Sequence, residues 1–127
     1  MESPKPSILC VDDNEDSREI LTYLFEEKGF EVTACKTLAE CLEQAGKNNF
    51  SVIILDYRFG DGTGLDACRK IRSQNLNTPI IFYSGEAREM EVKKAFEAGA
   101  TEYHFKPLGL DKLLETVSKL TQKSKSA

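Results

Sequence analysis

Five side chains that can do chemistry stand directly after four short apolar segments of this chain. They are Asp12, Asp13, Asp56, Ser84 and Lys106. Short, continuous apolar runs of this kind are typical of buried strands. In an open parallel sheet, ligand sites form at the carboxyl ends of the strands. The pattern therefore predicts one site with an acidic floor and a cationic lid.

The three carboxylates predict a cation among them. Carboxylates a few ångströms apart repel, and the pKa of one would rise strongly without a positive charge nearby. A small number of oxygen ligands with room for water suits Mg²⁺ better than zinc or a full calcium cage. Asp12 and Asp13 could instead simply cap the helix that follows, but a cap needs no third acid such as Asp56 from another strand. We therefore expect Asp12, Asp13 and Asp56 to hold Mg²⁺.

A metal beside a carboxylate also indicates a reaction. Mg²⁺ neutralises phosphoryl oxygens and orients a carboxylate for in-line attack, so Asp56 is a candidate nucleophile that would become an acyl phosphate. Lys106 would supply positive charge on the opposite flank, and a cis bond to Pro107 would aim it into the site. Ser84 could donate a hydrogen bond to a phosphoryl oxygen. Alone, Ser84 is better explained as a turn serine and Lys106 as a solvated lysine, so their joint placement carries the prediction.

The elements that must position these residues alternate between strand and helix. Strands are expected at about 7–11, 31–35, 52–56, 79–83 and 101–105, and helices at about 15–28, 37–46, 65–74, 87–98 and 110–121. This alternation predicts right-handed crossovers and a sheet covered on both faces. The expected fold is α/β: a flavodoxin-like doubly wound five-stranded parallel sheet of order 2-1-3-4-5 with five helices, in three α/β/α layers. Its crevice lies between the first and third strands.

Composition limits the class of protein. The 127 residues fit a single domain, 1–127, with a core at about 7–120 and short polar tails. A net charge of −4 argues against direct nucleic-acid binding. No apolar run could span a membrane, and the polar start lacks a signal peptide's apolar region, so a cytoplasmic location is expected. The four cysteines are expected to be reduced and mostly buried, with Cys35 the more exposed.

The placement of these five side chains resembles the receiver domain of two-component response regulators. Asp12-Asp13 follow the first strand, Asp56 the third, Ser84 the fourth and Lys106 the fifth, and the similarity extends over nearly the whole chain. The resemblance implies that Asp56 accepts a phosphoryl group from a histidine kinase or a histidine phosphotransfer protein. Such a domain is not an enzyme beyond supporting its own Mg²⁺-dependent phosphotransfer and dephosphorylation.

The resemblance also assigns roles at the site. Asp13 would bind Mg²⁺ directly and Asp12 through water, with the backbone carbonyl of Arg58 as a further ligand. Lys106 would contact the phosphoryl group. Ser84 and Tyr103 would form a switch pair, in which the hydroxyl moves toward the phosphate and the aromatic ring turns inward.

A phosphoryl group on Asp56 would change both the charge of the site and the number of hydrogen-bond acceptors in it. A phosphoryl group adds about −1.5 to −2 charge and several strong acceptors. Ser84 and Lys106 can reach those acceptors only by drawing their loops inward, which would change the face formed by the fourth helix, fifth strand and fifth helix. Moving a two-state equilibrium from 1:99 to 99:1 needs about 5.5 kcal/mol. Two or three charge-assisted hydrogen bonds of about 1.5–3 kcal/mol each supply that amount.

Several residues depart from the family pattern or are ambiguous. Receivers usually carry proline where Gly60 stands, so a mobile loop and weaker metal binding are expected. Gly64 matches the usual glycine and is expected to need a positive φ. Arg58 and Glu86 either form an ion pair that shields the acyl phosphate or are two independent solvated charges. His104 is expected to face helix packing rather than to take part in catalysis.

Several functional alternatives remain. The leading hypothesis is a stand-alone receiver that signals to a protein partner or relays phosphate. The chain could instead be the excised receiver of a larger response regulator or hybrid histidine kinase. An aspartate-nucleophile phosphatase would need a second aspartate where Arg58 stands. A flavodoxin is disfavoured because Asp12-Asp13 would repel the flavin phosphate, and a pseudo-receiver is disfavoured by the complete set of acids.

Overall fold

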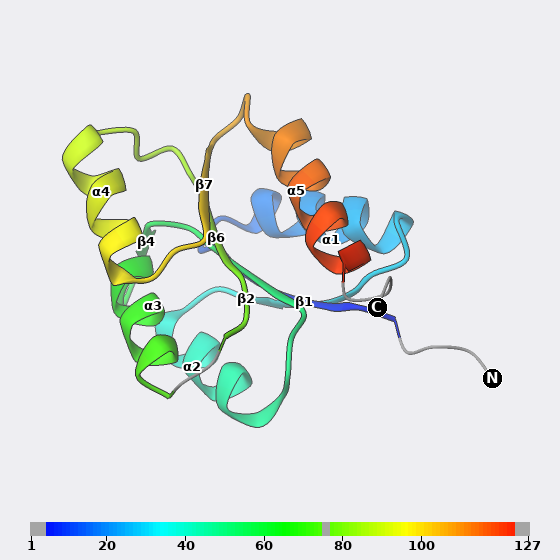
Figure 1. Ribbon diagram of the computed structural model, residues 1–127, viewed down its shortest axis with the longest axis horizontal. Coiled ribbons are helices and arrows are strands. Elements are labelled where there is room, and N and C mark those ends of the chain that lie inside the picture. Colours follow the sequence, from blue (N-terminus) through cyan, green and yellow to red (C-terminus); the bar gives the residue numbers. More distant parts are fainter. Residues whose placement is uncertain (1–4, 75–76, 124–127) are drawn as a thin grey trace.

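A five-stranded parallel sheet forms the centre of the computed structural model, which describes residues 5–74 and 77–123 (Figure 1). Its strands are β1 (Ser7–Val11), β2 (Glu31–Cys35), β3 (Val52–Leu55), β6 (Ile80–Ser84) and β7 (Glu102–Phe105). They are hydrogen-bonded in the order β2-β1-β3-β6-β7, and every neighbouring pair is parallel. Counted among these five strands alone, this is the predicted order 2-1-3-4-5, and the doubly wound fold is confirmed.

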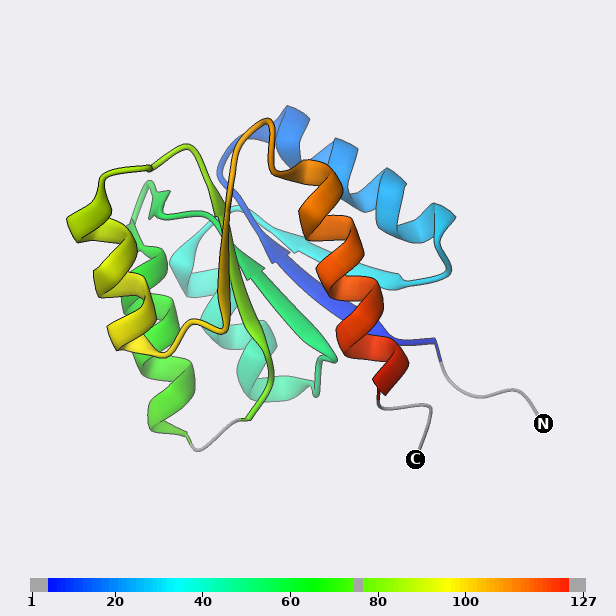
Figure 2. The same cartoon turned by 45° about the horizontal axis from the view of Figure 1, so that its top comes forward.

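Five helices cover the two faces of this sheet. They are α1 (Glu15–Glu27), α2 (Leu38–Lys47), α3 (Gly64–Ser73), α4 (Glu89–Ala98) and α5 (Leu110–Lys123). Figure 2 shows α1 and α5 on one face and α2, α3 and α4 on the other. The predicted three-layer α/β/α arrangement is therefore present, and its helix and strand bounds differ from the expected ones by at most two residues.

The sheet is apolar on both faces because alternate residues of its central strands enter two different cores. On β1, Leu9 and Val11 pack with residues of α2, α3 and α4, whereas Ile8 and Cys10 pack with residues of α1 and α5. All four are at most 1% exposed. Burial on both faces is what a continuous apolar strand sequence predicts.

Local sequence signals begin and end the helices. The Asn14 side chain accepts a hydrogen bond from the Ser17 amide (2.8 Å) and so caps α1. Gly29, after that helix, has φ +91°, the left-handed conformation that glycine commonly adopts after a helix. Gly46 does not end α2, which continues to Lys47. Glycine can be accommodated inside a helix at a modest cost, so its presence alone does not mark the end.

A short hairpin between β3 and α3 was not predicted. It consists of β4 (Arg58–Phe59) and β5 (Gly62–Thr63), paired antiparallel around a two-residue turn. Strands of two residues are too short to produce a recognisable alternation, so the sequence pattern could not reveal them.

All four cysteines are buried with free thiols. Cys35 is the most exposed of the four, as expected, but at 5% accessible it is still buried. It ends β2 with its side chain in the same core as Cys41 of α2. Burial raises the pKa of Cys35 to about 11 and that of Cys41 to about 12, so both thiols stay protonated at neutral pH.

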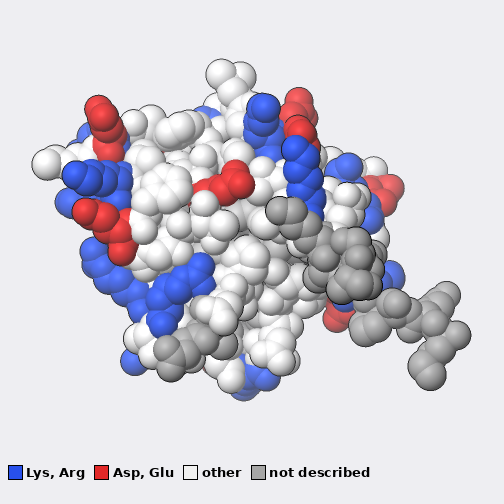
Figure 3. Space-filling model, in the orientation of Figure 1, with Lys and Arg blue, Asp and Glu red and all other residues white. Residues whose placement is uncertain are grey.

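The surface carries both signs of charge. Figure 3 shows both basic and acidic side chains on one face of the molecule. Among the residues that the structure describes, no helix combines the length and apolar character needed to cross a membrane.

Candidate functional site

The carboxyl ends of β1, β3 and β7 bring a lysine between two aspartates. Lys106 Nζ lies 2.5 Å from Asp12 Oδ2 and 3.0 Å from Asp56 Oδ2. These residues are 94 and 50 positions apart in sequence from the lysine. Parallel strands all end at one edge of the sheet, which is why residues so distant along the chain meet here.

The three aspartates form a cluster open to solvent on one side. Asp12, Asp13 and Asp56 each offer one carboxylate oxygen, and these oxygens lie within 4.8 Å of one another. Asp12 is buried, Asp56 is half-buried and Asp13 is exposed. A set of hard oxygen donors with a solvent-facing side suits Mg²⁺, which keeps several of its waters. The residues present therefore fit the expected ion.

Burial and charge act against each other at the lysine–aspartate contact. Burial raises the pKa of Asp12, and the hydrogen bond from Lys106 only partly offsets this. Burial lowers the pKa of Lys106, but its hydrogen bond to Asp12 and the charge of Asp56 more than compensate, so its pKa is raised overall. The ammonium is therefore fully charged at neutral pH and offsets part of the negative charge of the aspartates that it contacts.

The peptide bond after Lys106 has the conformation expected from the sequence. The Lys106-Pro107 peptide bond is cis. The Lys106 amide donates a hydrogen bond to the Ser84 carbonyl (2.9 Å), which fixes the end of β7 beside the end of β6.

Asp56 is held in place by a close approach of the chain at Gly64. The Gly64 amide donates a hydrogen bond to the Tyr57 carbonyl (2.7 Å), and a Cβ atom at Gly64 would lie 2.3 Å from the Asp56 main-chain oxygen. It would also lie 2.7 Å from the Phe82 ring. The expected positive φ at this glycine is wrong: among the described residues only Gly29 and Gly99 have one. Glycine is required here by space, not by backbone conformation.

Ser84 and Tyr103 meet at the main chain of Glu86. The Ser84 hydroxyl accepts a hydrogen bond from the Glu86 amide (3.2 Å), and the Tyr103 hydroxyl donates one to the Glu86 carbonyl (2.7 Å). The Tyr103 ring stacks on Phe82 at 5.5 Å between centroids. Burial raises the pKa of Tyr103 to about 12, so its hydroxyl remains a donor at neutral pH.

Arg58 and Glu86 form an ion pair, so they are not two independent solvated charges. Shielding of an acyl phosphate by this pair stays a prediction. Glu86 Oε1 lies 3.1 Å from Arg58 and 2.8 Å from Arg88. Hydrogen bonds from Arg88 lower the pKa of Glu86 to about 2. Arg88 was not singled out in the sequence, where it fell inside the helix expected at 87–98. In the structure α4 begins at Glu89, and Arg88 precedes it in the turn after β6, two residues from Glu86.

A second contact missed in the sequence joins Tyr57 to α4. The Tyr57 hydroxyl donates a hydrogen bond to the Glu91 carboxylate. The Arg58 guanidinium lies over the Tyr57 ring, 4.9 Å from its centroid. Since Tyr57 and Glu91 are 34 positions apart, no local pattern could have revealed the pair.

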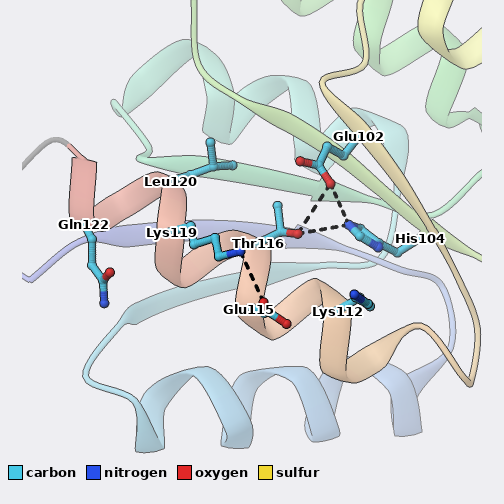
Figure 4. Close-up of a pocket in the computed structure, with 8 residues that line it drawn as sticks. All are labelled: Glu102, His104, Lys112, Glu115, Thr116, Lys119, Leu120 and Gln122. Atoms are coloured by element: carbon cyan, nitrogen blue, oxygen red, sulfur yellow. Dashed lines mark hydrogen bonds and ion pairs between the residues drawn. The ribbon is translucent and has the colours of Figure 1, made fainter.

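His104 belongs to a different hollow, between β7 and α5 (Figure 4). Its Nε2 atom lies 3.1 Å from Glu102 Oε1 and 3.3 Å from the Thr116 hydroxyl of α5. It thus packs against a helix, as expected, and lies in a different hollow from the one lined by Asp13 and Asp56.

Comparisons with known proteins agree on one family. The sequence profile of the "Response regulator receiver domain" matches residues 8–118. The transcriptional regulatory protein SrrA of Staphylococcus aureus is 30% identical over 119 residues, which are 94% of this chain and 49% of SrrA. The chain thus spans about half the length of the curated relatives it matches.

Two solved structures show how closely the fold agrees. The receiver domain of the Francisella response regulator 1452 superposes with a TM-score of 0.88 at 28% identity, covering 94% of this chain and 99% of that one. The BeF3-activated DrrB receiver domain superposes with a TM-score of 0.85 at 27% identity, with the same coverage.

Proposed function

Because this chain belongs to the response regulator receiver domain family, we propose that it is a phospho-accepting receiver of a two-component system, phosphorylated on Asp56. The donor is a histidine kinase or a histidine phosphotransfer protein. An Asp56 carboxylate oxygen forms a bond to phosphorus as the phosphorus–nitrogen bond of the phosphohistidine breaks. The imidazole nitrogen then takes up a proton, and the chain keeps an acyl phosphate.

The observation that carries this proposal is the contact of Lys106 with both Asp12 and Asp56. The ammonium offsets part of the negative charge of the three aspartates before the reaction and is within reach of a phosphoryl oxygen once Asp56 is modified. Preorganised charge of this kind lowers the energy of a transition state in which negative charge accumulates.

Mg²⁺, when bound, would supply further positive charge to the phosphoryl oxygens. Asp13 would hold it directly and Asp12 through water, with Asp56 and the Arg58 carbonyl completing the protein ligands. The clustered carboxylate oxygens support this assignment. The exposure of Asp13 leaves the approach to Asp56 open from the solvent side.

Ser84 and Tyr103 form the switch. A phosphoryl group on Asp56 offers the Ser84 hydroxyl a charged acceptor, which draws the loop after β6 toward the site. The Tyr103 hydroxyl is bound to that same loop at the Glu86 carbonyl, so movement of the loop changes the position of its ring. The altered surface comprises α4, β7 and α5.

The output is a protein partner that reads this surface, or onward transfer of the phosphoryl group. The chain supports its own phosphorylation and dephosphorylation and catalyses no other reaction, and it acts in the cytoplasm. Since its curated relatives are about twice as long, a second arrangement is that it serves as the receiver of a larger response regulator or hybrid histidine kinase.

Phosphorylation with acetyl phosphate tests the assignment. With Mg²⁺, the intact chain should gain the mass of one phosphate, and chelation of the metal should prevent the gain. Asp56→Asn should abolish it, whereas Asp111→Asn, which changes an exposed acid on α5, should leave it unchanged. A mass gain that persists in Asp56→Asn would overturn the proposal.

A further inference from the structure

The turn of the β4–β5 hairpin is bound to the N-terminus of α2 by one side chain. Asp61 Oδ1 accepts a hydrogen bond from the Leu38 amide (2.7 Å), and Asp61 Oδ2 accepts one from the Ala39 amide (3.1 Å). These are two of the amides that a helix leaves without intrahelical partners at its start. Both hydrogen bonds lower the pKa of Asp61, with that from Leu38 the stronger, so the carboxylate is charged at neutral pH.

The hairpin also packs directly on α2. A Cβ atom at Gly62 would lie 2.5 Å from Leu38 Cδ2 and 3.3 Å from Asp66 Oδ2. Phe59, on β4, is only 7% exposed and lies in the core cluster against which Leu38 packs. The turn and one strand of the hairpin are therefore both seated on the start of α2.

The other end of the hairpin is fixed by α3. Thr63, the last residue of β5, forms a capping box with Asp66: its hydroxyl accepts from the Asp66 amide (3.2 Å), and its amide donates to the Asp66 carboxylate (3.1 Å). Arg58 is the hairpin partner of Thr63. The main chain of Arg58, two residues after Asp56, is thus tied to two helices through the hairpin.

The turn itself has little else to restrain it. A Cβ atom at Gly60 would have nothing within 4 Å, so the first turn residue contributes no packing. The turn lacks the proline that would have fixed its backbone. The two hydrogen bonds accepted by Asp61 supply the restraint instead.

We propose that Asp61 is a positioning residue for the cation site: by binding the start of α2 it holds the hairpin, and with it the main chain of Arg58, in place beside Asp56. The inference rests on the proposed function, in which the Arg58 carbonyl is a ligand of Mg²⁺. Partners that orient a ligand typically change metal affinity about 10–100-fold when removed. Because Asp61 acts through the hairpin, we expect a smaller effect, an increase in the Mg²⁺ dissociation constant of about three- to tenfold.

The test compares Asp61→Ala with Thr37→Ala in the full chain. Thr37 caps the same helix, accepting from the Glu40 amide (3.1 Å), but has no hydrogen bond to the hairpin turn. Titration with Mg²⁺ alone should show weaker binding for Asp61→Ala and binding within about twofold of wild type for Thr37→Ala. Asp61→Asn, whose side-chain oxygen can accept one of the two hydrogen bonds, should lie between wild type and Asp61→Ala.

Phosphorylation kinetics separate positioning from a general loss of structure. For Asp61→Ala, the Mg²⁺ concentration giving half-maximal phosphorylation by acetyl phosphate should rise, while the rate at saturating Mg²⁺ should stay within about twofold of wild type. If Asp61→Ala fails to fold, Asp61→Asn takes its place in both measurements.

Three outcomes would overturn the inference: unchanged Mg²⁺ affinity in the Asp61 variants, an equal loss in Thr37→Ala, or a wild-type chain that does not bind Mg²⁺. The last outcome would also remove the metal from the proposed function. A wild-type chain that binds Mg²⁺ but takes up no phosphate would overturn the proposed function alone, because the Mg²⁺ titrations would still decide the role of Asp61.

Discussion

The Tyr57 hydroxyl donates a hydrogen bond to the Glu91 carboxylate, joining the residue after Asp56 to the first turn of α4. The carboxylate is held on its other side by Lys94, 3.2 Å away. Burial raises the pKa of Tyr57 to about 12, and the bond to Glu91 adds to the shift. The segment that carries Asp56 is therefore linked to α4 as well as to the helices that hold the hairpin.

Tyr57 should titrate with a pKa of about 12 in the folded protein. Its folded pKa lies above the ordinary value of about 10. Its contribution to stability is therefore fully present below pH 10 and is lost as the pH rises through about 12. The measurement is the pH dependence of the tyrosine Cζ resonances.

Comparison of variants assigns this titration. Tyr57→Phe should remove one high-pH transition and leave that of Tyr103, whose pKa is also about 12, and that of Tyr83, whose pKa burial also raises. Glu91→Gln should lower the pKa of Tyr57 but leave it above the ordinary value, because burial is the larger cause. A Tyr57 transition near pH 10 in the wild type would contradict the structure.

Lys106→Met should destabilise the metal-free protein, because Asp12 and Asp56 would lose their positive partner. Removing one member of a fully buried ion pair costs about 3–5 kcal/mol. The Lys106 side chain is 20% exposed and that of Asp56 is 16% exposed. We therefore expect a smaller loss, about 2–3 kcal/mol in the free energy of unfolding at pH 7. Urea denaturation measures it, and saturating Mg²⁺ should recover most of it.

A control variant and a comparison at two pH values accompany Lys106→Met. Lys119→Met removes an exposed partner of Glu115 on α5 and should change stability by less than about 1 kcal/mol. For Lys106→Met, the loss should be smaller at pH 5 than at pH 7, because the pKa of Asp12 is already raised and protonation relieves the repulsion. A loss that Mg²⁺ does not reduce would argue against a cation site at these carboxylates.

Gly64→Ala should both destabilise the protein and slow phosphorylation of Asp56. The added methyl group would press on the Asp56 carbonyl, which is main chain and cannot turn aside. Overpacking of this kind costs about 1–3 kcal/mol. Gly60→Ala is the matched control, since its methyl group would meet nothing within 4 Å, and it should change stability by less than about 0.5 kcal/mol. Equal effects of the two substitutions would refute the spatial argument.

The sequence was sufficient to predict the sheet and the side chains at its edge. The run 52–55 is apolar throughout because both faces of β3 are covered, and Asp56 follows where the strand ends. The other central strands are also apolar and buried on both faces. The order of the strands, and the edge of the sheet at which the site lies, therefore followed from topology rules.

The missed features depend on contacts between distant segments. Glu91 reaches Tyr57, 34 positions away, only because α4 packs where it does. Gly64 was expected to need a positive φ because that is the common reason for a glycine in a turn, whereas the actual reason is the proximity of Asp56. Steric requirements of this kind appear only when the neighbouring segments are in place.

Beryllofluoride, a phosphoryl mimic, should change the surroundings of Tyr103 as well as those of Asp56. In the structure, the Tyr103 hydroxyl donates a hydrogen bond to the Glu86 carbonyl and its ring stacks on Phe82. Movement of Ser84 toward the mimic would disturb the Glu86 main chain, because the Ser84 hydroxyl accepts from the Glu86 amide. Amide spectra with Mg²⁺ and beryllofluoride should therefore shift across α4, β7 and the start of α5.

Tyr103→Phe tests whether the hydrogen bond from the Tyr103 hydroxyl to the Glu86 carbonyl opposes the rearrangement of α4, β7 and α5. The variant keeps the stacked ring but loses the bond to the Glu86 carbonyl, worth about 0.5–1.5 kcal/mol. Its spectrum without beryllofluoride should lie partway toward the activated spectrum of the wild type, and it should bind the mimic at least as tightly. Tyr23→Phe, an exposed tyrosine on α1, is the control and should behave as wild type. The wild-type shifts could be confined to residues beside Asp56. In that case Ser84 and Tyr103 do not act as a switch, and a partner must recognise the modified carboxylate directly.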